Sequence, residues 1–345
     1  REVGRPVVTP APSHDCVYVT SGWGIHDDRW MNALRSVGFT PIAISLDEAA
    51  RGAADLRSDV EAATRGTLPV LAGPLHSVTR QLVGVTAPVI GLSWGYDFDE
   101  LANAGDISWL SGLDGLVVDS WANSTAAIEY GVAESRITFL PWGIDLDQFP
   151  TGGPQIDPED LDLPNDAKLL VSLRAHESLY RVGDIIDAFI RVSNAVPEAA
   201  LVIGHEGALT DSFRATVRES GLGTRVRFIG MLPEPDLAPL LRGATAYITA
   251  SQADGTSVTL LQAMACGAAV IASGTAGNRG WVAEGATGLT FPVGDVPALA
   301  VCMRRACQED LAPLTRRARV TVEREADWFA NLSRLRRAMD QASRA

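Results

Sequence analysis

Short apolar runs alternate with helical segments along the chain, and this alternation limits the possible folds more than any other feature. The runs at 16–22 and 39–47 are rich in β-forming residues, whereas residues 27–38 between them have apolar side chains at helical spacing and end in glycine. Strands that alternate with helices favour parallel sheets covered by helices on both faces. The sequence therefore predicts an α/β protein.

A segment rich in proline, glycine and aspartate at 145–167 interrupts this pattern, which starts again at 168–175. A chain of 345 residues exceeds the size at which one hydrophobic core stops growing, so two domains are expected. We predict domains over residues 1–150 and 151–325, and a C-terminal helix over 326–345 that can pack back on the first domain. Ligands bind beyond the carboxyl ends of the strands in such sheets, which predicts a site in a cleft between the two domains.

Negative charge is concentrated in the first part of the chain. Residues 1–150 contain 19 acidic side chains and 9 arginines, a net charge of −10, and the remaining residues bring the total to −13. This excess repels nucleic acid and anionic membranes and can attract a small cation, although acidity can also serve solubility alone.

Two further features bear on location. The sequence has no apolar run long enough for a membrane span, and its start, expected to be a solvated arm, lacks the apolar core of a signal peptide. The four cysteines have no metal-ligand spacing, so we expect reduced, mostly buried thiols in a cytoplasmic protein; they are Cys16, Cys266, Cys302 and Cys307.

The stretch "DGTSVTLLQAMACG" at 254–267 predicts a tight turn that opens a helix and a glycine that ends it. Thr256 and Ser257 can cap this helix, and a phosphate at its N-terminus would meet free N–H donors. Gln262 lies one turn after Val258, where it can donate a hydrogen bond to a sugar hydroxyl. Taken alone, the stretch favours a capped core helix.

Three longer parts of the sequence resemble a known family. Residues 248–273, followed by 277–295, are similar to the C-terminal signature of the family 4 retaining glycosyltransferases, and residues 115–149 are similar to the end of that family's N-terminal domain. Residues 171–189 are a weaker third match. The resemblance extends over roughly 16–343. It implies the GT-B architecture, in which two Rossmann-like domains have parallel sheets that face an interdomain cleft. The N-terminal domain would then bind the acceptor and the C-terminal domain the nucleotide sugar.

The resemblance also implies which residues bind the donor. Asp254 falls on the family's first glutamate, which contacts the donor sugar, and Gln262 falls on the second, which holds the ribose. Arg174 matches the diphosphate-binding arginine. The partner lysine is missing, and Tyr180 and Arg181 stand there instead. The other implied donor-binding residues are Gly22, Gly24, Arg181, Gly204, Met231, Leu232, Gly255, Thr256, Ser257 and Val258.

Alternatives remain open for these residues. Arg174 and Arg181 can form surface ion pairs instead of holding a diphosphate. Because both acids of the family's motif are altered, an inactive descendant is a second possibility.

The acceptor site implied for the N-terminal domain consists of His26, Trp94 and Asp97. A lone histidine is more often a packed or surface residue, and Asp97 can equally be a helix cap. The triplet Asp97–Phe98–Asp99 resembles the metal motif of another glycosyltransferase class, but this fold rarely needs a metal, so we expect no metal site.

The implied function is a retaining hexosyltransferase that uses a UDP or GDP sugar and no cofactor, with Asp254, Arg174 and Asp97 as the catalytic set. The acidic first domain suggests an aminocyclitol or aminosugar acceptor of natural-product or glycoconjugate biosynthesis; lipid-linked or polysaccharide acceptors compete with it. A sugar-nucleotide epimerase, a phosphorylase and a non-catalytic nucleotide-sugar-binding homologue are the rival functions. We expect no nucleic-acid or membrane partner and a monomer or homodimer.

Overall fold

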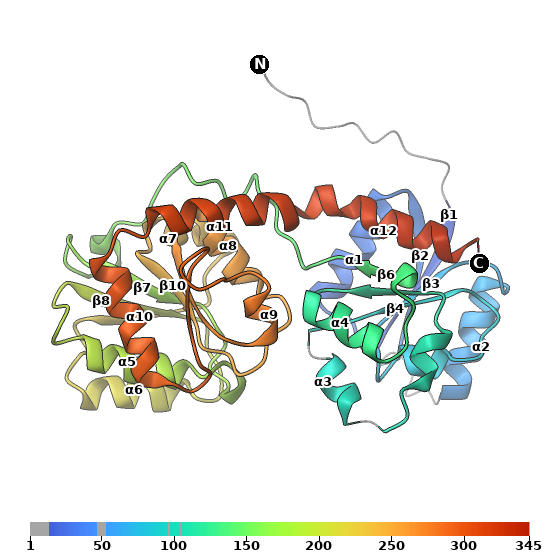
Figure 1. Ribbon diagram of the computed structural model, residues 1–345, viewed down its shortest axis with the longest axis horizontal. Coiled ribbons are helices and arrows are strands. Elements are labelled where there is room, and N and C mark those ends of the chain that lie inside the picture. The colour runs from blue at the N-terminus through green and yellow to red at the C-terminus, as the bar shows by residue number, and fades with distance from the viewer. Residues whose placement is uncertain (1–13, 47–52, 96, 104, 345) are drawn as a thin grey trace, which may run out of the picture. The chain divides into compact units, whose positions relative to one another are not determined.

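The computed structural model describes residues 14–46, 53–95, 97–103 and 105–344. Contacts divide the chain into two compact units, Arg1–Pro141 with Phe329–Ala345, and Trp142–Trp328 (Figure 1). The first limit lies nine residues before the one predicted at 150, and the second lies three residues after the one predicted at 325. The N-terminal arm predicted ahead of the first strand lies almost wholly outside the described residues.

The first unit contains a six-stranded sheet in which every pairing is parallel. Its strand order is β2 (Phe39–Ser45), β1 (His14–Thr20), β3 (Val70–Ala72), β4 (Val89–Leu92), β5 (Gly115–Val118) and β6 (Ile137–Phe139). Its helices are α1 (Ile25–Ser36), α2 (Ala53–Thr64), α3 (Asp97–Ala102), α4 (Trp121–Glu129) and α12 (Trp328–Ala342).

The last helix, α12, packs on the first unit although the second unit separates them in the sequence. Arg336 donates from Nη1 to the carbonyl oxygen of Val37 over 2.8 Å, and its guanidinium lies 5.0 Å from the ring centre of Phe39. Asp340 accepts from Nε of Arg336 one turn further along the helix. These contacts join the C-terminal helix to the segment between α1 and β2.

The second unit also contains a six-stranded parallel sheet. Its strand order is β12 (Leu289–Phe291), β11 (Ala269–Ser273), β10 (Ala246–Thr249), β7 (Lys168–Ser172), β8 (Ala199–Gly204) and β9 (Val226–Gly230). Its helices are α5 (Val182–Val192), α6 (Thr210–Glu219), α7 (Glu234–Gly243), α8 (Val258–Cys266), α9 (Ala276–Arg279), α10 (Val296–Gln308) and α11 (Ala312–Glu325).

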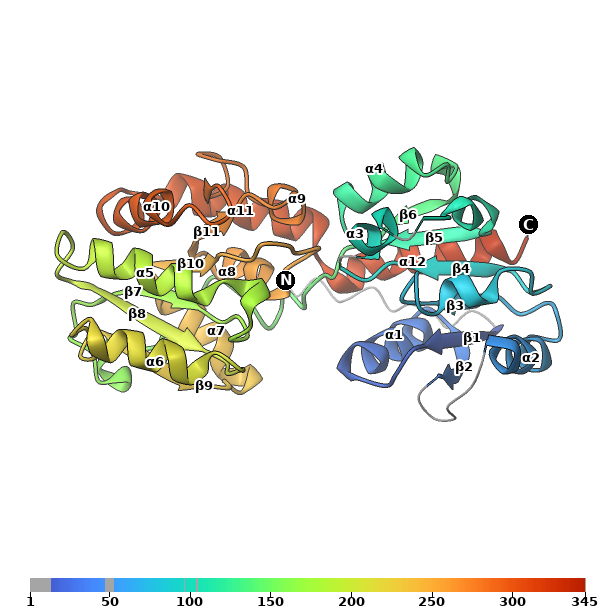
Figure 2. The same ribbon diagram turned by 90° about the horizontal axis from the view of Figure 1, so that it is seen from below.

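Alternate residues of the central strands enter two separate cores in the second unit. Leu170 and Leu201 belong to the core beneath α5, α6 and α10, whereas Val171 and Val202 belong to the core beneath α7, α8 and α11. Figures 1 and 2 show these two helix sets on opposite faces of the sheet. The fold confirms the predicted α/β class, because strands buried on both faces read as the near-continuous apolar runs of the sequence.

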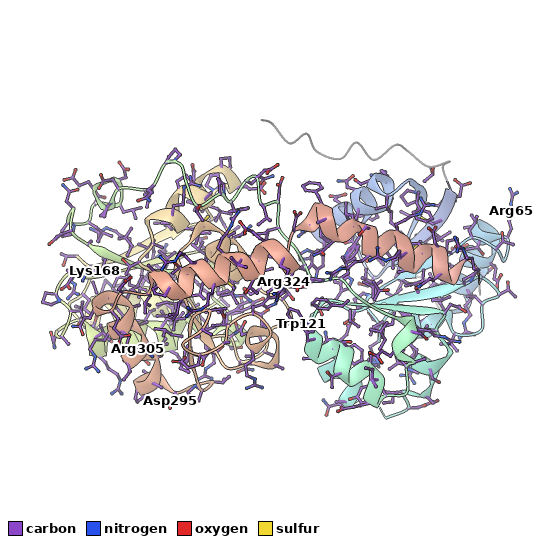
Figure 3. All side chains as sticks on the ribbon, turned by 45° about the horizontal axis from the view of Figure 1, so that its top comes forward. Arg65, Trp121, Lys168, Asp295, Arg305 and Arg324 are labelled. Atoms are coloured by element: carbon purple, nitrogen blue, oxygen red, sulfur yellow. The ribbon has the colours of Figure 1, made fainter. Side chains whose placement is uncertain are left out.

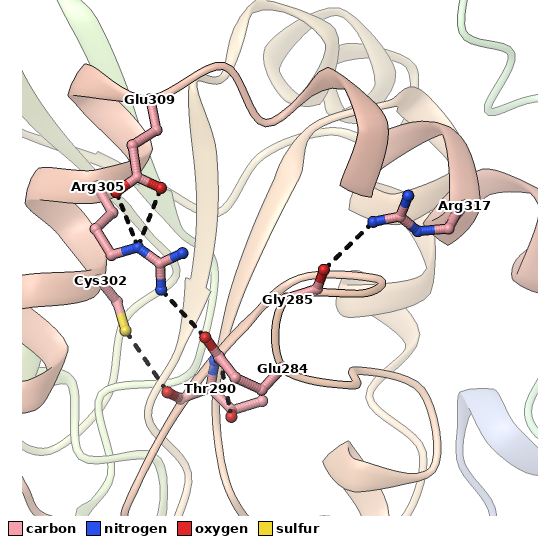
Figure 4. Close-up of polar contacts among 7 residues, drawn as sticks. All are labelled: Glu284, Gly285, Thr290, Cys302, Arg305, Glu309 and Arg317. Atoms are coloured by element: carbon pink, nitrogen blue, oxygen red, sulfur yellow. Dashed lines mark hydrogen bonds and ion pairs between the residues drawn. The ribbon is translucent and has the colours of Figure 1, made fainter.

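The tail after β11 is tied to the last two helices of this unit (Figure 4). Glu284 accepts from the backbone N–H of Thr290 and from Nη1 of Arg305, the latter at 3.1 Å. Arg317 donates from Nε to the carbonyl oxygen of Ala286 over 2.7 Å. These contacts hold the glycine-rich segment that leads into β12.

Among the described residues, no helix combines the length and the apolar character that a membrane crossing requires.

Candidate functional site

Arg174 and Asp254 meet at one edge of the second sheet. Arg174 follows β7 and Asp254 follows β10, and these two strands are neighbours. Parallel strands end at the same edge of a sheet, so residues distant in sequence converge there. This edge is where ligands bind in open α/β sheets.

The guanidinium of Arg174 contacts three side chains. Nη2 donates to Oδ2 of Asp254 over 2.8 Å, and Nη1 donates to Oγ of Ser257 over 2.8 Å. The ring of Tyr180 covers one guanidinium face, with Cζ of Arg174 4.2 Å from the ring centre. The side chains of Arg174 and Asp254 are 11% and 13% exposed, so the ion pair that the sequence allowed is largely buried and not on the surface.

Nε of Arg174 is buried and makes no hydrogen bond to the described residues. A buried donor without a partner costs free energy, and on a cation it is a site where an anion or a water molecule can bind. The arrangement therefore suits a phosphate oxygen at this atom.

Burial raises the pKa of Asp254 above its usual range, and the Arg174 guanidinium opposes this rise. The carboxylate form thus depends on its cationic partner. Loss of either side chain would leave the other as an uncompensated charge in a mostly buried place.

The turn at 254–257 opens α8 as predicted, and α8 ends at Gly267, which has a φ of +84°. Ser257 occupies the N-cap position, as predicted, but its side chain makes no capping bond. Its hydroxyl accepts from Arg174. The first N–H groups of α8 therefore have no bond from the Ser257 side chain.

Gly277 in α9 packs directly against this turn and was not singled out from the sequence. A Cβ atom at this position would stand 2.0 Å from the carbonyl oxygen of Gly255 and 2.1 Å from that of Asp254. Only glycine permits this approach. Its place at the start of the 277–295 block is the signal that could have identified it.

A chain of buried polar contacts lies next to the same turn. The hydroxyl of Ser273 donates to the carbonyl oxygen of Ser251 over 2.6 Å, and Asn278 donates from Nδ2 to the carbonyl oxygen of Ser273 over 2.9 Å. These bonds join the ends of β10 and β11 to α9, next to the turn at 254–257.

Two more residues implied to bind the donor belong to the second unit. Gln262 is half-buried on α8. Arg181 begins α5 with a φ of +49° and pairs with Asp184 over 2.7 Å, so it forms the local ion pair that the sequence allowed. Its role as a diphosphate clamp stays a prediction.

Three more of the predicted donor-binding residues lie at or just after the ends of β8 and β9. Gly204 ends β8, and a Cβ atom there would stand 2.5 Å from Cδ2 of Leu173, the neighbour of Arg174. Met231 is 67% exposed after β9, whereas Leu232 packs against the core. An exposed thioether and a half-buried leucine after β9 suit contact with a flat base, which stays a prediction.

In the first unit, the structure brings together the three predicted acceptor residues. The rings of His26 and Trp94 contact edge to face with centres 5.9 Å apart. Asp97 accepts at Oδ2 from the backbone N–H groups of Trp94 and Leu75, over 2.7 and 3.0 Å. These bonds hold the loops after β3 and β4, a role close to the cap alternative.

Burial raises the pKa of Asp97 to about 6, although its two backbone hydrogen bonds favour the carboxylate. Partial burial also lowers the pKa of His26, and the nearby Arg29 adds to this effect. Asp97 is therefore partly protonated in mildly acidic solution, and the neutral form of His26 is favoured.

Asp119 is a second buried carboxyl at this edge and was missed from the sequence. It follows β5 and accepts at Oδ1 from Nδ2 of Asn123 over 2.7 Å. Burial raises its pKa to about 7, and the charge of Asp97 adds to the rise. An acid directly after the apolar run at 115–118 was the available signal.

The first loop of this unit contains the predicted glycines. Gly24 donates its backbone N–H to Oδ2 of Asp27 over 2.7 Å and forms the N-cap of α1. The carbonyl oxygen of Gly22 accepts from the Thr20 hydroxyl over 3.2 Å. Donor contact by these glycines stays a prediction.

Comparisons with known proteins give a consistent family. Residues 155–321 match the model for glycosyl transferases group 1. The D-inositol 3-phosphate glycosyltransferase 1 of Catenulispora acidiphila is 28% identical over 223 residues, which are 61% of this chain and 53% of that protein. The glycogen synthase of Mycobacterium tuberculosis is 29% identical over 204 residues, 58% of this chain and 47% of that protein. The chain thus spans about half the length of the curated relatives it matches.

Solved structures share the fold at lower identity. A glycosyltransferase from Rickettsia africae has a TM-score of 0.79 at 15% identity, covering 96% of this chain and 98% of that chain. HepE of Anabaena, solved in complex with UDP and glucose, has a TM-score of 0.72 at 14% identity, covering 94% of this chain and 99% of that chain. Together, these comparisons show that residues 155–321 belong to glycosyl transferases group 1 and that the chain has the GT-B fold.

Proposed function

We propose that the chain is a retaining glycosyltransferase that moves a sugar from a UDP or GDP donor to a hydroxyl group of a small acceptor. The observation that carries this proposal is the buried cluster of Arg174, Asp254 and Ser257 at the carboxyl ends of β7 and β10. It lies within the residues that match the family, and its cation has a buried N–H group free for an anion.

Departure of the nucleoside diphosphate is the step that this cluster can assist. The bond between the anomeric carbon and the phosphate oxygen breaks, and negative charge grows on the leaving phosphate. Arg174 and the positive end of α8 would stabilise that charge.

Front-face attack by the acceptor hydroxyl fits the pairing of Asp254 with Arg174. A carboxylate engaged in an ion pair is a poor nucleophile for a covalent sugar intermediate. The acceptor oxygen would bond to the anomeric carbon on the face that the phosphate leaves, and the phosphate would take the hydroxyl proton.

An aminocyclitol or aminosugar is the proposed acceptor. The net charge of −10 over residues 1–150 and the carboxyls of Asp97 and Asp119 support a cationic group near His26 and Trp94. Since the pKa values of both carboxyls are raised, a bound ammonium group would favour their charged forms and lower those pKa values.

A phosphorylated cyclitol is a second candidate, because one relative is named for D-inositol 3-phosphate. Arg29 stands on α1 near His26, and although burial lowers its pKa to about 10, it remains charged at pH 7. It could pair with a phosphate group.

A donor and acceptor panel separates these options. The chain would be incubated with UDP and GDP sugars and with an aminocyclitol, an inositol phosphate or a glycan, and nucleoside diphosphate release and product configuration would be followed by NMR. Release that needs the aminocyclitol, with retained configuration, supports the proposal, and release that needs the inositol phosphate supports the second candidate. Conversion of the donor sugar without any acceptor indicates an epimerase, and an absence of turnover despite nucleotide binding indicates a non-catalytic homologue.

The phosphorylase rival lacks a suitable lysine. Lys168, the sole lysine of the sequence, begins β7 (Figure 3). It pairs with Glu198 over 3.0 Å. Arg174 follows the other end of that strand, so Lys168 is not placed to bind pyridoxal phosphate at the proposed site.

A cytoplasmic location and a monomeric or homodimeric state complete the proposal. The four cysteines are free and buried. Burial raises the pKa of Cys266, Cys302 and Cys307 to about 11, so these thiols are poor nucleophiles. Unreactive thiols are compatible with a reducing compartment.

A further inference from the structure

We propose that Tyr180 is a positioning residue that holds the guanidinium of Arg174 in the orientation that binds the diphosphate of the donor. The inference rests on the proposed function and deepens it. Tyr180 and Arg181 stand where the family resemblance places a second phosphate-binding cation, a lysine. Arg181 can still supply a charge although it pairs with Asp184, whereas the Tyr180 ring cannot. The structure assigns it a different task.

The side chains around Arg174 contact its guanidinium in two ways, along one edge and at the planar face. Asp254 and Ser257 accept from the two terminal nitrogens and fix one edge of the planar guanidinium. Two contacts on one edge leave the tilt of the plane free. Cζ of Arg174 lies over the Tyr180 ring, 4.2 Å from its centre, and this third contact restricts the tilt.

Stacking suits the chemistry of the guanidinium. Its charge is delocalised and weakly hydrated, so it stacks on aromatic rings better than an ammonium group does. The attraction is larger where water is excluded, and the Arg174 side chain is only 11% exposed. The stacked cation keeps its remaining N–H groups, including the unpartnered Nε, for a ligand.

The backbone couples the ring to the rest of the site. Tyr180 ends the short 3₁₀ helix Ser178–Tyr180, and the carbonyl oxygen of Leu179 accepts from the N–H of Gln252 over 2.9 Å. Gln252 belongs to the loop that leads into Asp254. The segment that carries Tyr180 is therefore hydrogen-bonded to the loop that carries Asp254.

Simple packing is the competing explanation, since Tyr180 is half-buried against the core around α5. The two explanations differ in what they predict for ligand binding. A packing role affects unfolding without a specific link to Arg174, whereas a positioning role weakens diphosphate binding only while Arg174 is present.

The test compares Tyr180→Leu with Tyr180→Phe in the full chain, in the Arg174 background and in an Arg174→Met background. Dissociation constants for UDP and GDP are measured by calorimetry. Tyr180→Leu removes the ring, so we expect about tenfold weaker binding of the better nucleotide. Tyr180→Phe retains the ring and should restore affinity to within about twofold of the parent. In the Arg174→Met background, Tyr180→Leu should have no further effect.

Tyr130→Leu is the matched control, because Tyr130 packs on Phe98 in the first unit and contacts no donor residue proposed above. Unchanged binding in Tyr180→Leu overturns the inference, as does an equal loss in Tyr180→Phe. If the parent binds neither nucleotide, the proposed function is wrong in its donor class. The positioning role is then decided by the unliganded protein: coupling between Tyr180→Leu and Arg174→Met in the free energy of unfolding keeps it, and additivity overturns it.

Discussion

Arg174 is the residue on which the proposed chemistry depends most. It combines an ion pair to Asp254, a hydrogen bond to Ser257 and a stack on Tyr180, and its side chain is only 11% exposed. Arginine suits this place because a planar fork can keep two donors on protein oxygens and present others to a phosphate. A lysine there would have one nitrogen for all of these contacts.

Replacing Arg174 with lysine tests this reasoning. The Arg174→Lys variant keeps a positive charge beside Asp254 but loses the fork and the stack, so kcat/KM for the donor should fall by about 100-fold. Arg191→Lys, on an exposed position of α5, is the matched control and should behave as the parent. An Arg174→Lys enzyme with parental kcat/KM would show that the diphosphate binds elsewhere.

Replacing Gln262 with glutamate tests whether the altered motif limits activity. A glutamate adds a charged acceptor for the ribose hydroxyls, and a charged hydrogen bond is stronger by about 1 kcal/mol than a neutral one. Gln262→Glu should therefore bind UDP or GDP about fivefold more tightly, as measured by calorimetry. A parent that transfers sugar excludes the non-catalytic rival, whereas a silent parent that gains turnover from this change supports it.

At the scale of elements, the site is a turn held between two helices. The 254–257 turn leads into α8, and Gly277 of α9 packs against the turn at a distance that leaves no room for a side chain. This arrangement explains why a glycine far from the motif in sequence matters to it.

Gly277→Ala should displace the turn. The added Cβ would overlap the carbonyl oxygens of Asp254 and Gly255, so the Arg174 contacts would be disturbed. Overpacking of this kind costs about 1–3 kcal/mol of stability, and we expect donor turnover to fall at least tenfold because a small misplacement is costly in catalysis. Gly223→Ala is the control, since its Cβ would meet nothing within 4 Å. Parental turnover and melting temperature in Gly277→Ala would contradict this role.

At the scale of the whole molecule, the buried carboxyls of the first unit make stability depend on pH. Burial raises the pKa of Asp119 to about 7 and that of Asp97 to about 6, above the ordinary value of 3.8. The folded state therefore binds protons that the unfolded state releases. This contribution to stability is present below about pH 4 and is lost as the pH rises through 6 and 7.

Asp119→Asn should flatten this dependence, because the amide mimics the protonated acid and can still accept from Asn123 at its oxygen. The variant should gain on the order of 4 kcal/mol over the parent at pH 8, since the rise of about three pKa units corresponds to about 1.4 kcal/mol for each unit. Little difference is expected at pH 4. Melting curves of the parent and the variant from pH 4 to 8 measure both differences. If the stability difference between variant and parent is the same at pH 8 as at pH 4, the raised pKa of Asp119 is refuted.

The sequence by itself determined the fold class and the local structure of the segment at 254–267. Apolar runs that alternate with helical segments impose parallel sheets, and the motif at 254–267 predicted the turn, the helix and the Gly267 stop, all of which rest on local spacing and backbone preference. The tertiary structure alone decided what those residues contact. The Ser257 hydroxyl serves Arg174 instead of the helix, Tyr180 covers the guanidinium, Gly277 supports the turn, and Asp119 lies buried beside Asn123. The contacts of Arg174 with Ser257 and of Gly277 with the turn join segments that are distant in the chain, so no local pattern encodes them. They exist only once the sheet of the second unit has brought those strand ends to one edge. Arg174 and Tyr180, and Asp119 and Asn123, are near neighbours in the sequence, but only the folded structure decides that these side chains lie together.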